Sequence, residues 1–436
     1  MKPTGLLIAV ALLAVLGGAV WWSNKKQASA DNSKKAETTT KLLSIPDDQF
    51  QNIRIKKVTG EVLDLDRSSG KWKLTEPKPL PADQDAVSGV VTNLSNLNAD
   101  AVIEENASDL KQYGLADPTL DITVKRKDGK TDELLIGDDT PTGAGAYAKV
   151  AGSPKVVTIA SFVKTSLDKK PEDLRDKRLL TFDQDKITRV DLQAKGPAVE
   201  FGKDAQGEWQ ILKPKPLRAD SSAVNGVVDK LRDAKMDLTA AGDANKSFAG
   251  AARVATATVA DASGNHTLEV RKDKDKTYFA KSSDVEGAYK ISSDVGDALD
   301  KGLDDFRNKK LFDFGFSDPS KVEVPGAVYD KSGDKWMSGG KAMDNASVQN
   351  LIDKLRDLAA TKFVETGAGS PVFTATVTSN SGKRVEKVTI RKQGDNYFAQ
   401  RENEPSIYQL DAKAVDDLQA AAKDVKPAPP EAPKKK

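Results

Sequence analysis

One block of sequence occurs three times along the chain, and this repetition limits the possible folds more than any other feature. Residues 70–97 begin GKWKLTEPKPL, residues from 207 begin GEWQILKPKPL, and a more divergent copy, DKWMSGGKAMD, begins at residue 334. At the shift that takes Trp72 to Trp209 (209 − 72 = 137), twelve positions from 77 to 94 are identical. Repetition over this period predicts a series of similar folding units.

Each copy predicts a strand followed by a helix. The strand carries the tryptophan, and a Pro-x-Pro segment then ends the ladder, because proline has no N–H to donate. Asp83 and Asp220 follow at positions typical of a helix N-cap. Apolar residues at helical spacing come next: Val87, Val90, Val91, Leu94 and Leu97, then Val224, Val227, Val228 and Leu231, then Val348, Leu351, Ile352, Leu355 and Leu358. We interpret the tryptophans as core residues; the alternative is a stacking platform for a sugar or peptide.

The flanking sequence predicts short antiparallel strands. Turn signals at Thr59-Gly60, Asp128-Gly129, Ser263-Gly264 and Ser381-Gly382 join alternating apolar stretches. The predicted fold class is α+β, with three tandem repeats of antiparallel strands and two helices each. We place repeat 1 at residues 42–182, repeat 2 at 183–314, a degenerate repeat 3 at 315–425, and a disordered Pro/Lys tail at 426–436.

The N-terminus predicts a membrane anchor at residues 1–22. Gly5 to Trp22 is an uncharged, mainly aliphatic run of 18 residues, about 27 Å as a helix, which is just enough to span a bilayer. The alternative is a signal peptide cleaved at Ala28-Ser29-Ala30. Residues 23–41 form a flexible linker with a coil span of roughly 24 Å.

The orientation of this anchor has two interpretations. Lysines 25, 26, 34 and 35 follow the anchor and only Lys2 precedes it, so the positive-inside rule places the body in the cytoplasm. A polar linker and a cysteine-free body favour export instead. We expect a single-pass inner-membrane protein whose body is extracytoplasmic, in the periplasm.

Composition and motifs argue against several classes of function. A net charge of +2 gives no basic footprint for nucleic acid, and the absence of cysteine excludes thiolate chemistry. The single histidine, His266, follows a turn, and we interpret it as a solvent-side turn residue. Asp64, Asp66 and Ser68 alternate like calcium-loop ligands, but the twelfth position is Thr75, so a plain hairpin is favoured. We expect no enzyme activity, no cofactor, no metal and no small-molecule substrate.

Two basic clusters near the repeat boundaries are the candidate partner-binding residues: Arg175, Lys177 and Arg178, and Arg307, Lys309 and Lys310. The simpler interpretation is a solvated helix end whose cations pair with Asp173, Asp176 and Asp305. The functional one is a patch for a protein partner or an anionic lipid headgroup.

The YGLADP segment from Tyr113, the Gly-x-Trp strand with Pro-x-Pro, and LRDKRLL from Leu174 together resemble the bacterial domain-of-unknown-function family 4340. The resemblance covers residues 42–425, and repeat 3 departs from it by losing Pro-x-Pro. It implies anchored repeat proteins often encoded beside gliding-motility-type ABC transporter components, and it supplies no catalytic residue. We expect a scaffold or accessory protein of an ABC-type export system, bound to an integral membrane protein such as its permease. A polysaccharide-binding module of the cell wall and a cryptic hydrolase are the alternatives.

Overall fold

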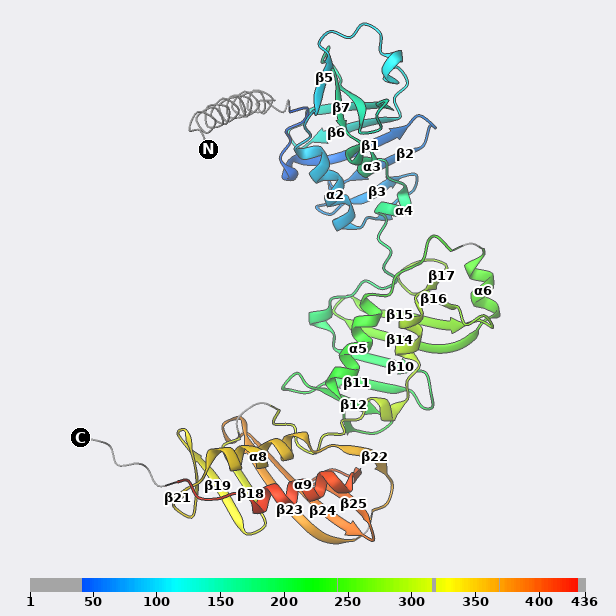
Figure 1. Cartoon of the computed structure of the whole chain (residues 1–436). Helices are drawn as coiled ribbons and strands as arrows, with labels where there is room; N and C mark the ends of the chain where they lie inside the picture. Colours follow the sequence, from blue (N-terminus) through cyan, green and yellow to red (C-terminus); the bar gives the residue numbers. More distant parts are fainter. Residues whose placement is uncertain (1–40, 241, 316–318, 368, 430–436) are drawn as a thin grey trace, which may run out of the picture. The chain divides into compact units, whose positions relative to one another are not determined.

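The computed structural model describes residues 41–240, 242–315, 319–367 and 369–429 (Figure 1). The chain divides into two compact units, the first ending at Lys177 and the second beginning at Arg178. The predicted anchor, nearly all of the linker, and tail residues 430–436 lie outside the described residues. Within the described ranges, no helix combines the length and the apolar character needed to cross a bilayer.

The first unit holds an antiparallel sheet in the order β4-β3-β2-β1-β6-β7-β8-β9-β5. Its strands are β1 (Phe50–Lys57), β2 (Val62–Asp66), β3 (Lys73–Glu76), β4 (Leu80–Pro81), β5 (Ala101–Glu104), β6 (Leu120–Arg126), β7 (Thr131–Asp139), β8 (Gly145–Val150) and β9 (Val156–Ala160). Its helices are α2 (Gln84–Ser95), α3 (Ser161–Leu167) and α4 (Pro171–Leu174), with 3-10 turns η1 (Asp47–Gln49) and η2 (Lys111–Tyr113).

The second unit begins with a sheet in the order β13-β12-β11-β10-β14-β15-β16-β17. Its strands are β10 (Arg189–Gln193), β11 (Val199–Lys203), β12 (Trp209–Lys213), β13 (Leu217–Arg218), β14 (Ala252–Asp261), β15 (Gly264–Lys272), β16 (Tyr278–Ser282) and β17 (Ala288–Ile291). Its helices are α5 (Ser221–Arg232), α6 (Ala244–Gly250) and α7 (Ser293–Leu299), with 3-10 turns η3 (Gln184–Lys186) and η4 (Leu303–Asp305).

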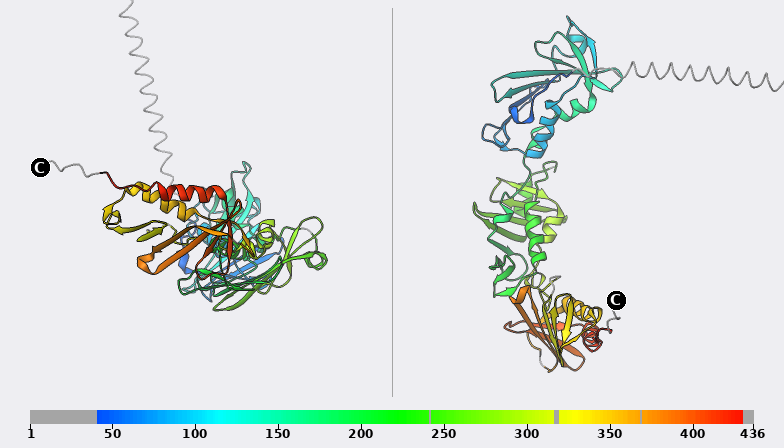
Figure 2. Two further views of the ribbon diagram at one scale, coloured as in Figure 1. Left: turned by 90° about the horizontal axis from the view of Figure 1, so that it is seen from below. Right: turned by 90° about the vertical axis from the view of Figure 1, so that its left-hand side faces the viewer.

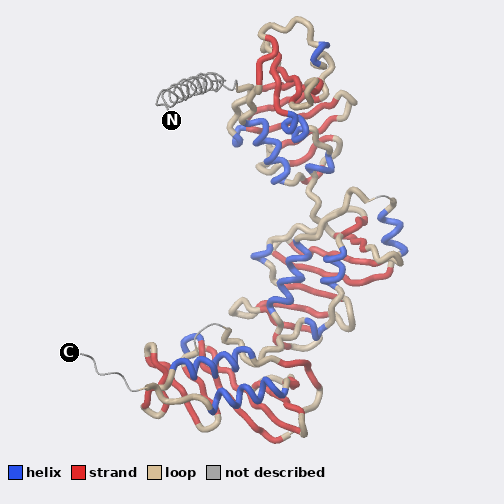
Figure 3. The backbone as a smooth tube through the Cα atoms, viewed as in Figure 1, coloured by secondary structure: helices blue, strands red, loops and turns tan. Residues whose placement is uncertain are grey.

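The third sheet, also in the second unit, has the order β21-β20-β19-β18-β23-β24-β25-β26-β22. Its strands are β18 (Lys321–Val324), β19 (Ala327–Ser332), β20 (Lys335–Ser338), β21 (Lys341–Ala342), β22 (Ala360–Val364), β23 (Ser370–Ser379), β24 (Arg384–Gln393), β25 (Asn396–Arg401) and β26 (Ile407–Leu410), with the 3-10 turn η5 (Asn380–Gly382). Helices α8 (Asn345–Asp357) and α9 (Ala412–Lys423) lie side by side on one face of this sheet (Figure 2 and Figure 3). The three sheets confirm the α+β class and its antiparallel repeats. Each has one helix midway and one at its end, and the short helices α4 and α6 bring the first two sheets above the two helices predicted for each repeat.

The repeated helices form as their sequences predict. Asp83 accepts backbone N–H groups at the start of α2, Asp220 does so at α5, and Asp344 does so at α8. The apolar stripes predicted on these helices are buried against their sheets, each in a separate hydrophobic core. Trp72, Trp209 and Trp336 are each 4–5% exposed, so the core interpretation of the tryptophans is confirmed.

The Pro-x-Pro segment ends the strand that carries the tryptophan, as predicted, but the chain then pairs with the sheet again within a few residues. It returns at once as a two-residue edge strand, β4 beside β3 and β13 beside β12. In the third sheet Gly339 and Gly340 make the same return with φ values of 52° and 78°. Two left-handed residues form a tight turn that glycine adopts without strain, so the divergent copy retains the fold without its prolines.

Each repeat ends with the same kind of backbone bridge. A residue that follows the last helix pairs with the residue just before the N-cap of the middle helix, as Ala82 with Arg175, Ala219 with Arg307, and Met343 with Pro427. The chain then begins the next repeat by pairing beyond the next middle helix, as Arg178 with Lys235 and Lys310 with Ala359.

The residues just after each junction pack into the following sheet. Leu179 and Leu180 lie in the core of the second sheet, and Leu311, Phe312 and Phe314 lie in the core of the third. Within the second unit, the junction between the second and third sheets positions the side chains of the polar network described next.

Candidate functional site

Arg307 and Arg175, one from each predicted cluster, are partly buried in the fold. Arg307 stacks over the ring of Phe363 at 3.4 Å, pairs with Asp304 at 3.1 Å and donates to Ser406 at 3.1 Å. Its side chain is only 12% exposed. Arg175, in the first unit, is half-buried beside its backbone bridge to Ala82. Arg307 therefore helps to hold β22 in place and presents little surface to a partner.

The remaining members of the clusters are more accessible. Lys309 and Lys310 are exposed, as is Arg178 at the start of the second unit, whereas Lys177 is half-buried at the end of the first. The acids expected beside them have local roles. Asp173 and Asp305 each accept the backbone N–H three residues earlier, from Lys170 at 2.9 Å and from Gly302 at 2.8 Å. Within the second unit, Lys309 and Lys310 are adjacent and both exposed.

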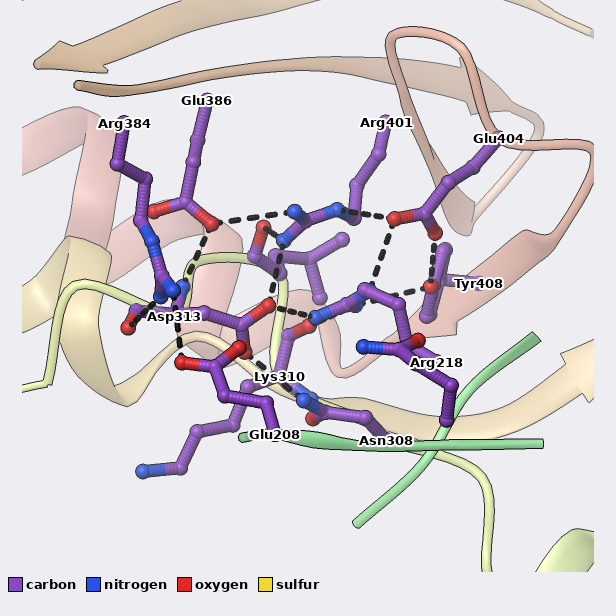
Figure 4. A network of polar contacts seen from close by, with 12 residues as sticks. Glu208, Arg218, Asn308, Lys310, Asp313, Arg384, Glu386, Arg401, Glu404 and Tyr408 are labelled. Carbon is purple, nitrogen blue, oxygen red and sulfur yellow. Dashed lines mark hydrogen bonds and ion pairs between the residues drawn. The ribbon is translucent and has the colours of Figure 1, made fainter. Parts of the chain in front are cut away.

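A network of polar contacts joins the second sheet to the third (Figure 4). Arg218, at the end of β13, pairs with Asp313 and with Glu404 at 2.8 Å. It also donates to the hydroxyl of Tyr408 at 3.0 Å and to the carbonyl of Lys310 at 2.5 Å. The side chain of Arg218 is 15% exposed, and those of Asp313 and Glu404 are 20% and 21% exposed. Arg218 of the second sheet thus binds two carboxylates, Asp313 and Glu404, on the side of the third sheet. The contact between these two sheets is called the joint below.

A second arginine, Arg401 of β25, completes the network from within the third sheet. It pairs with Glu404 at 2.7 Å and with Glu386 at 3.1 Å, and it donates to the carbonyl of Leu311 at 2.6 Å. Burial raises the pKa of Glu386, although the Asp313 N–H and Arg401 partly oppose this shift. A carboxylate this deeply buried is stabilised only while its cation remains in place.

A second link crosses the same joint at its edge. Arg384 of β24 pairs with Glu208 of the β11–β12 turn at 2.7 Å and donates to the carbonyl of Asp313 at 2.7 Å. Asn308 donates to the Asp313 carboxylate at 2.8 Å. The Asp313 segment is therefore held from both sheets, which fixes their relative position within the second unit.

A cleft of about 550 Å³ lies beside this network, between the second and third sheets. Its lining combines the start of α5, the junction and the turn before β12: Glu208, Trp209, Gln210, Arg218, Ala219, Asp220, Ser221, Ser222, Asn308, Lys309, Lys310 and Asp313. The cleft brings the exposed Lys309 and Lys310 together with three acidic groups. The cleft is polar and mixed in charge.

His266 has a different setting from the one predicted. The interpretation as a solvent-side turn residue is wrong, because β15 begins at Gly264 and places His266 within the strand. Its Nδ1 lies 2.7 Å from Asp284, and its Nε2 lies 2.9 Å from the Ser263 hydroxyl and 3.4 Å from Asp261. Its side chain is 12% exposed.

The calcium-like spacing at residues 64–70 belongs to the β2–β3 hairpin. Asp66 accepts the N–H of Ser68 at 3.0 Å within the turn, while Asp64 lies in the strand and binds Asn52 at 2.7 Å and Thr75 at 2.7 Å. These carboxylates are committed to different partners. No group of three or more His, Asp or Glu side chains converges as a metal site within the residues that the structure describes.

Sequence reasoning missed the joint between the second and third sheets. Its members come from positions 208 to 408, and nothing local marks them as a group. One signal was present: at the 137-residue shift, Arg218 stands where the first repeat has Pro81. Arginine at a position that is proline in the first repeat adds a charged donor there, and this was the one sequence signal of a polar contact.

Comparison with protein-family models gives two overlapping matches. The model described as "Domain of unknown function (DUF4340)" matches residues 72–244 and again residues 209–383. Together these matches cover well over half of the chain and agree with the repeats seen in the fold. No curated protein and no solved structure matches the chain.

Proposed function

The chain belongs to the DUF4340 family, whose description assigns no activity, and from this premise we propose a non-catalytic, membrane-anchored scaffold. Its body is extracytoplasmic, its anchor is residues 5–22, and it serves as an accessory protein of an ABC-type export system. Its partner is an integral membrane protein, such as the transporter permease.

The observation that carries the proposal is the fixed joint between the second and third sheets. Arg218 and Arg384 each bridge the joint through ion pairs, so the cleft beside them has a preset shape. A preformed surface loses less conformational entropy when a partner binds. Repeat proteins commonly recognise proteins through surfaces shared by neighbouring repeats. Lys309 and Lys310 supply the exposed charge that would orient such a partner.

Site-specific cross-linking in intact cells tests this proposal. A photoreactive residue in place of Ser222, which lines the cleft, should trap an integral membrane protein. Charge reversal by Lys309→Glu with Lys310→Glu should weaken the trapping while the protein stays folded. Lys274→Glu is the matched control, because Lys274 is exposed in the β15–β16 turn and is not part of the cleft. Recovery of only peptidoglycan or free glycan, unchanged by the lysine variants, would favour the wall-binding alternative.

One observation favours the second alternative, a hydrolase. Ser263, His266 and Asp284 show the order of contacts of a serine hydrolase triad, with Nε2 toward the serine and Nδ1 toward the acid. However, the Ser263 hydroxyl also lies 2.6 Å from Asp261, which competes for its proton and would repel a developing oxyanion. A fluorophosphonate probe distinguishes the two: labelling that Ser263→Ala abolishes would support the hydrolase, and no labelling is expected of the scaffold.

A further inference from the structure

The two carboxylates that bind His266 also hold the chain where it enters the second sheet. Asp284 accepts the N–H of Thr181 at 2.9 Å, and Asp261 accepts the N–H of Asp183 at 2.7 Å. The ring of Phe182, between these residues, lies 6.2 Å from the His266 ring. Residues 181–183 are therefore fastened to the β14–β15 hairpin and to the turn after β16 through one histidine and its two acids.

We propose that His266, Asp261 and Asp284 form a pH-sensitive clasp, which holds residues 181–183 while His266 is protonated and loosens when it loses that proton. A protonated imidazole donates from both nitrogens and so bridges Asp284 and Asp261. The neutral ring keeps one N–H. This N–H donates to Asp284, whose carboxylate lies closer to the ring than that of Asp261. Nε2 then carries only a lone pair, which faces the Asp261 carboxylate without an intervening proton, because the Ser263 hydroxyl donates its one proton to Asp261 at 2.6 Å.

The surrounding charges favour the protonated ring. Burial lowers the pKa of His266, but hydrogen bonding and charge from Asp284, followed by Asp261, outweigh burial and raise it above its ordinary value. The pKa of Asp261 is held well below its ordinary range, mainly by the Ser263 hydroxyl and the Asp183 N–H. The other charged groups facing the cluster come from the entering segment: Asp183 faces Asp261, and Lys186 pairs with Asp183 at 2.9 Å.

The direction of the pH dependence follows from these shifts. Because the pKa of His266 is raised in the folded protein, its stabilising contribution is complete below the ordinary value of about 6.5 and is lost as pH rises through the folded value. The contribution of Asp261 is present above about pH 3.9 and is lost only as pH falls through its depressed value. The clasp is thus closed between about pH 4 and pH 6.5 and opens above that range.

The chain contains one histidine, so its titration can be measured without ambiguity. NMR of the tag-free full-length protein, with labelled histidine, gives the pKa, and amide exchange gives the protection of Thr181 and Asp183. We expect a midpoint above 6.5 and a loss of protection across that midpoint, by up to about tenfold for each unit of pKa difference between closed and open states. The Thr188 amide, bound to the Ala260 carbonyl at 2.9 Å, is the internal control and should not change.

Two variants make the test specific. His266→Gln should remove the midpoint from the exchange of Thr181, and comparison at equal pH corrects for intrinsic exchange rates. Asp284→Asn retains the histidine and should lower its pKa, because the largest favourable contact is lost. A histidine that titrates at or below 6.5, or Thr181 and Asp183 amides whose protection is unchanged across the midpoint, would overturn the proposal.

Discussion

Replacement of Arg218 by methionine tests the joint between the second and third sheets directly. Methionine retains much of the apolar stem but removes the charge that Asp313 and Glu404 share. Removing one partner of a buried ion pair costs about 3–5 kcal/mol, because the other charge remains poorly solvated. Arg401 still lies 2.7 Å from Glu404 and 3.6 Å from Asp313, so part of this charge stays compensated. We therefore expect a loss near the lower limit, about 3 kcal/mol.

Urea unfolding of the full-length protein, followed by hydrogen exchange of individual segments, measures this loss. The segments around Asp313 and Glu404 should exchange faster in Arg218→Met than in the wild type, while the first unit is unaffected. Arg54→Met is the matched control. Arg54 pairs with Asp64 at 3.4 Å and with Glu76 at 3.2 Å, but its side chain is 43% exposed. An exposed pair contributes only about 0–1 kcal/mol.

Comparison of these two variants tests whether burial of the ion pairs sets the cost of removing the arginine. If Arg218→Met and Arg54→Met lowered the free energy of unfolding by equally small amounts, the argument that poor solvation of the joint sets the cost of losing Arg218 would be refuted. Addition of Glu404→Gln to Arg218→Met should recover part of the stability, because it removes a carboxylate left short of a cation. A double variant less stable than Arg218→Met alone would refute the same reasoning.

Three further outcomes are expected. Trp209→Ala should lower the free energy of unfolding by about 3–5 kcal/mol and unfold the second sheet. Free quenching of the wild-type tryptophan fluorescence by acrylamide would contradict the burial of Trp209. Asp220→Ala should cost about 1 kcal/mol in urea unfolding, because Asp220 accepts the Ala223 N–H at 3.1 Å as the cap of α5. The intact mass of protein extracted from membranes should include residues 1–30, whereas a chain starting at Asp31 would show cleavage after Ala30.

The parts of the fold that sequence predicted depend on local interactions. An N-cap such as Asp83 and an apolar stripe such as that of α2 involve neighbours a few residues apart, so the sequence contains the whole signal. The hairpin after Thr59-Gly60 is similar, because β1 and β2 flank the turn directly. Repetition strengthened each of these predictions, since three copies reported the same pattern.

The candidate site depends on distant contacts, and its chemistry was not predictable in the same way. Arg218 meets Tyr408 across 190 positions, and His266 meets Asp284 across 18. The basic clusters were recognised from composition, but the pairing of Arg307 with Phe363 depends on how two sheets meet. A single sequence gives the charge of such residues but does not show which distant side chains they contact.

The second and third sheets each hold the chain segment that enters them, but they use different side chains to do so. His266 pairs with Val259 in the second sheet as Glu386 pairs with Val377 in the third, so the two residues occupy one structural position. Ser282 and Arg401 likewise correspond, and they donate to the carbonyls of Leu179 and Leu311. The third sheet holds its entering segment with an arginine that stays charged at every physiological pH, whereas the second uses a histidine.

This correspondence predicts that pH dependence can be removed by transplanting the third sheet's residues. The triple variant His266→Glu, Ser282→Arg and Asp284→Asn gives the cluster one cation and two carboxylates, the same net charge as the wild-type cluster with protonated His266. The glutamate introduced at position 266 should accept the Thr181 N–H, as Glu386 accepts that of Asp313 at 2.8 Å. Protection of the Thr181 amide should then be constant between about pH 6 and pH 8, because no remaining group of the cluster titrates there. The single variant Ser282→Arg retains His266 and should retain a midpoint. If the triple variant still lost protection across this range, a group other than His266 would control the segment.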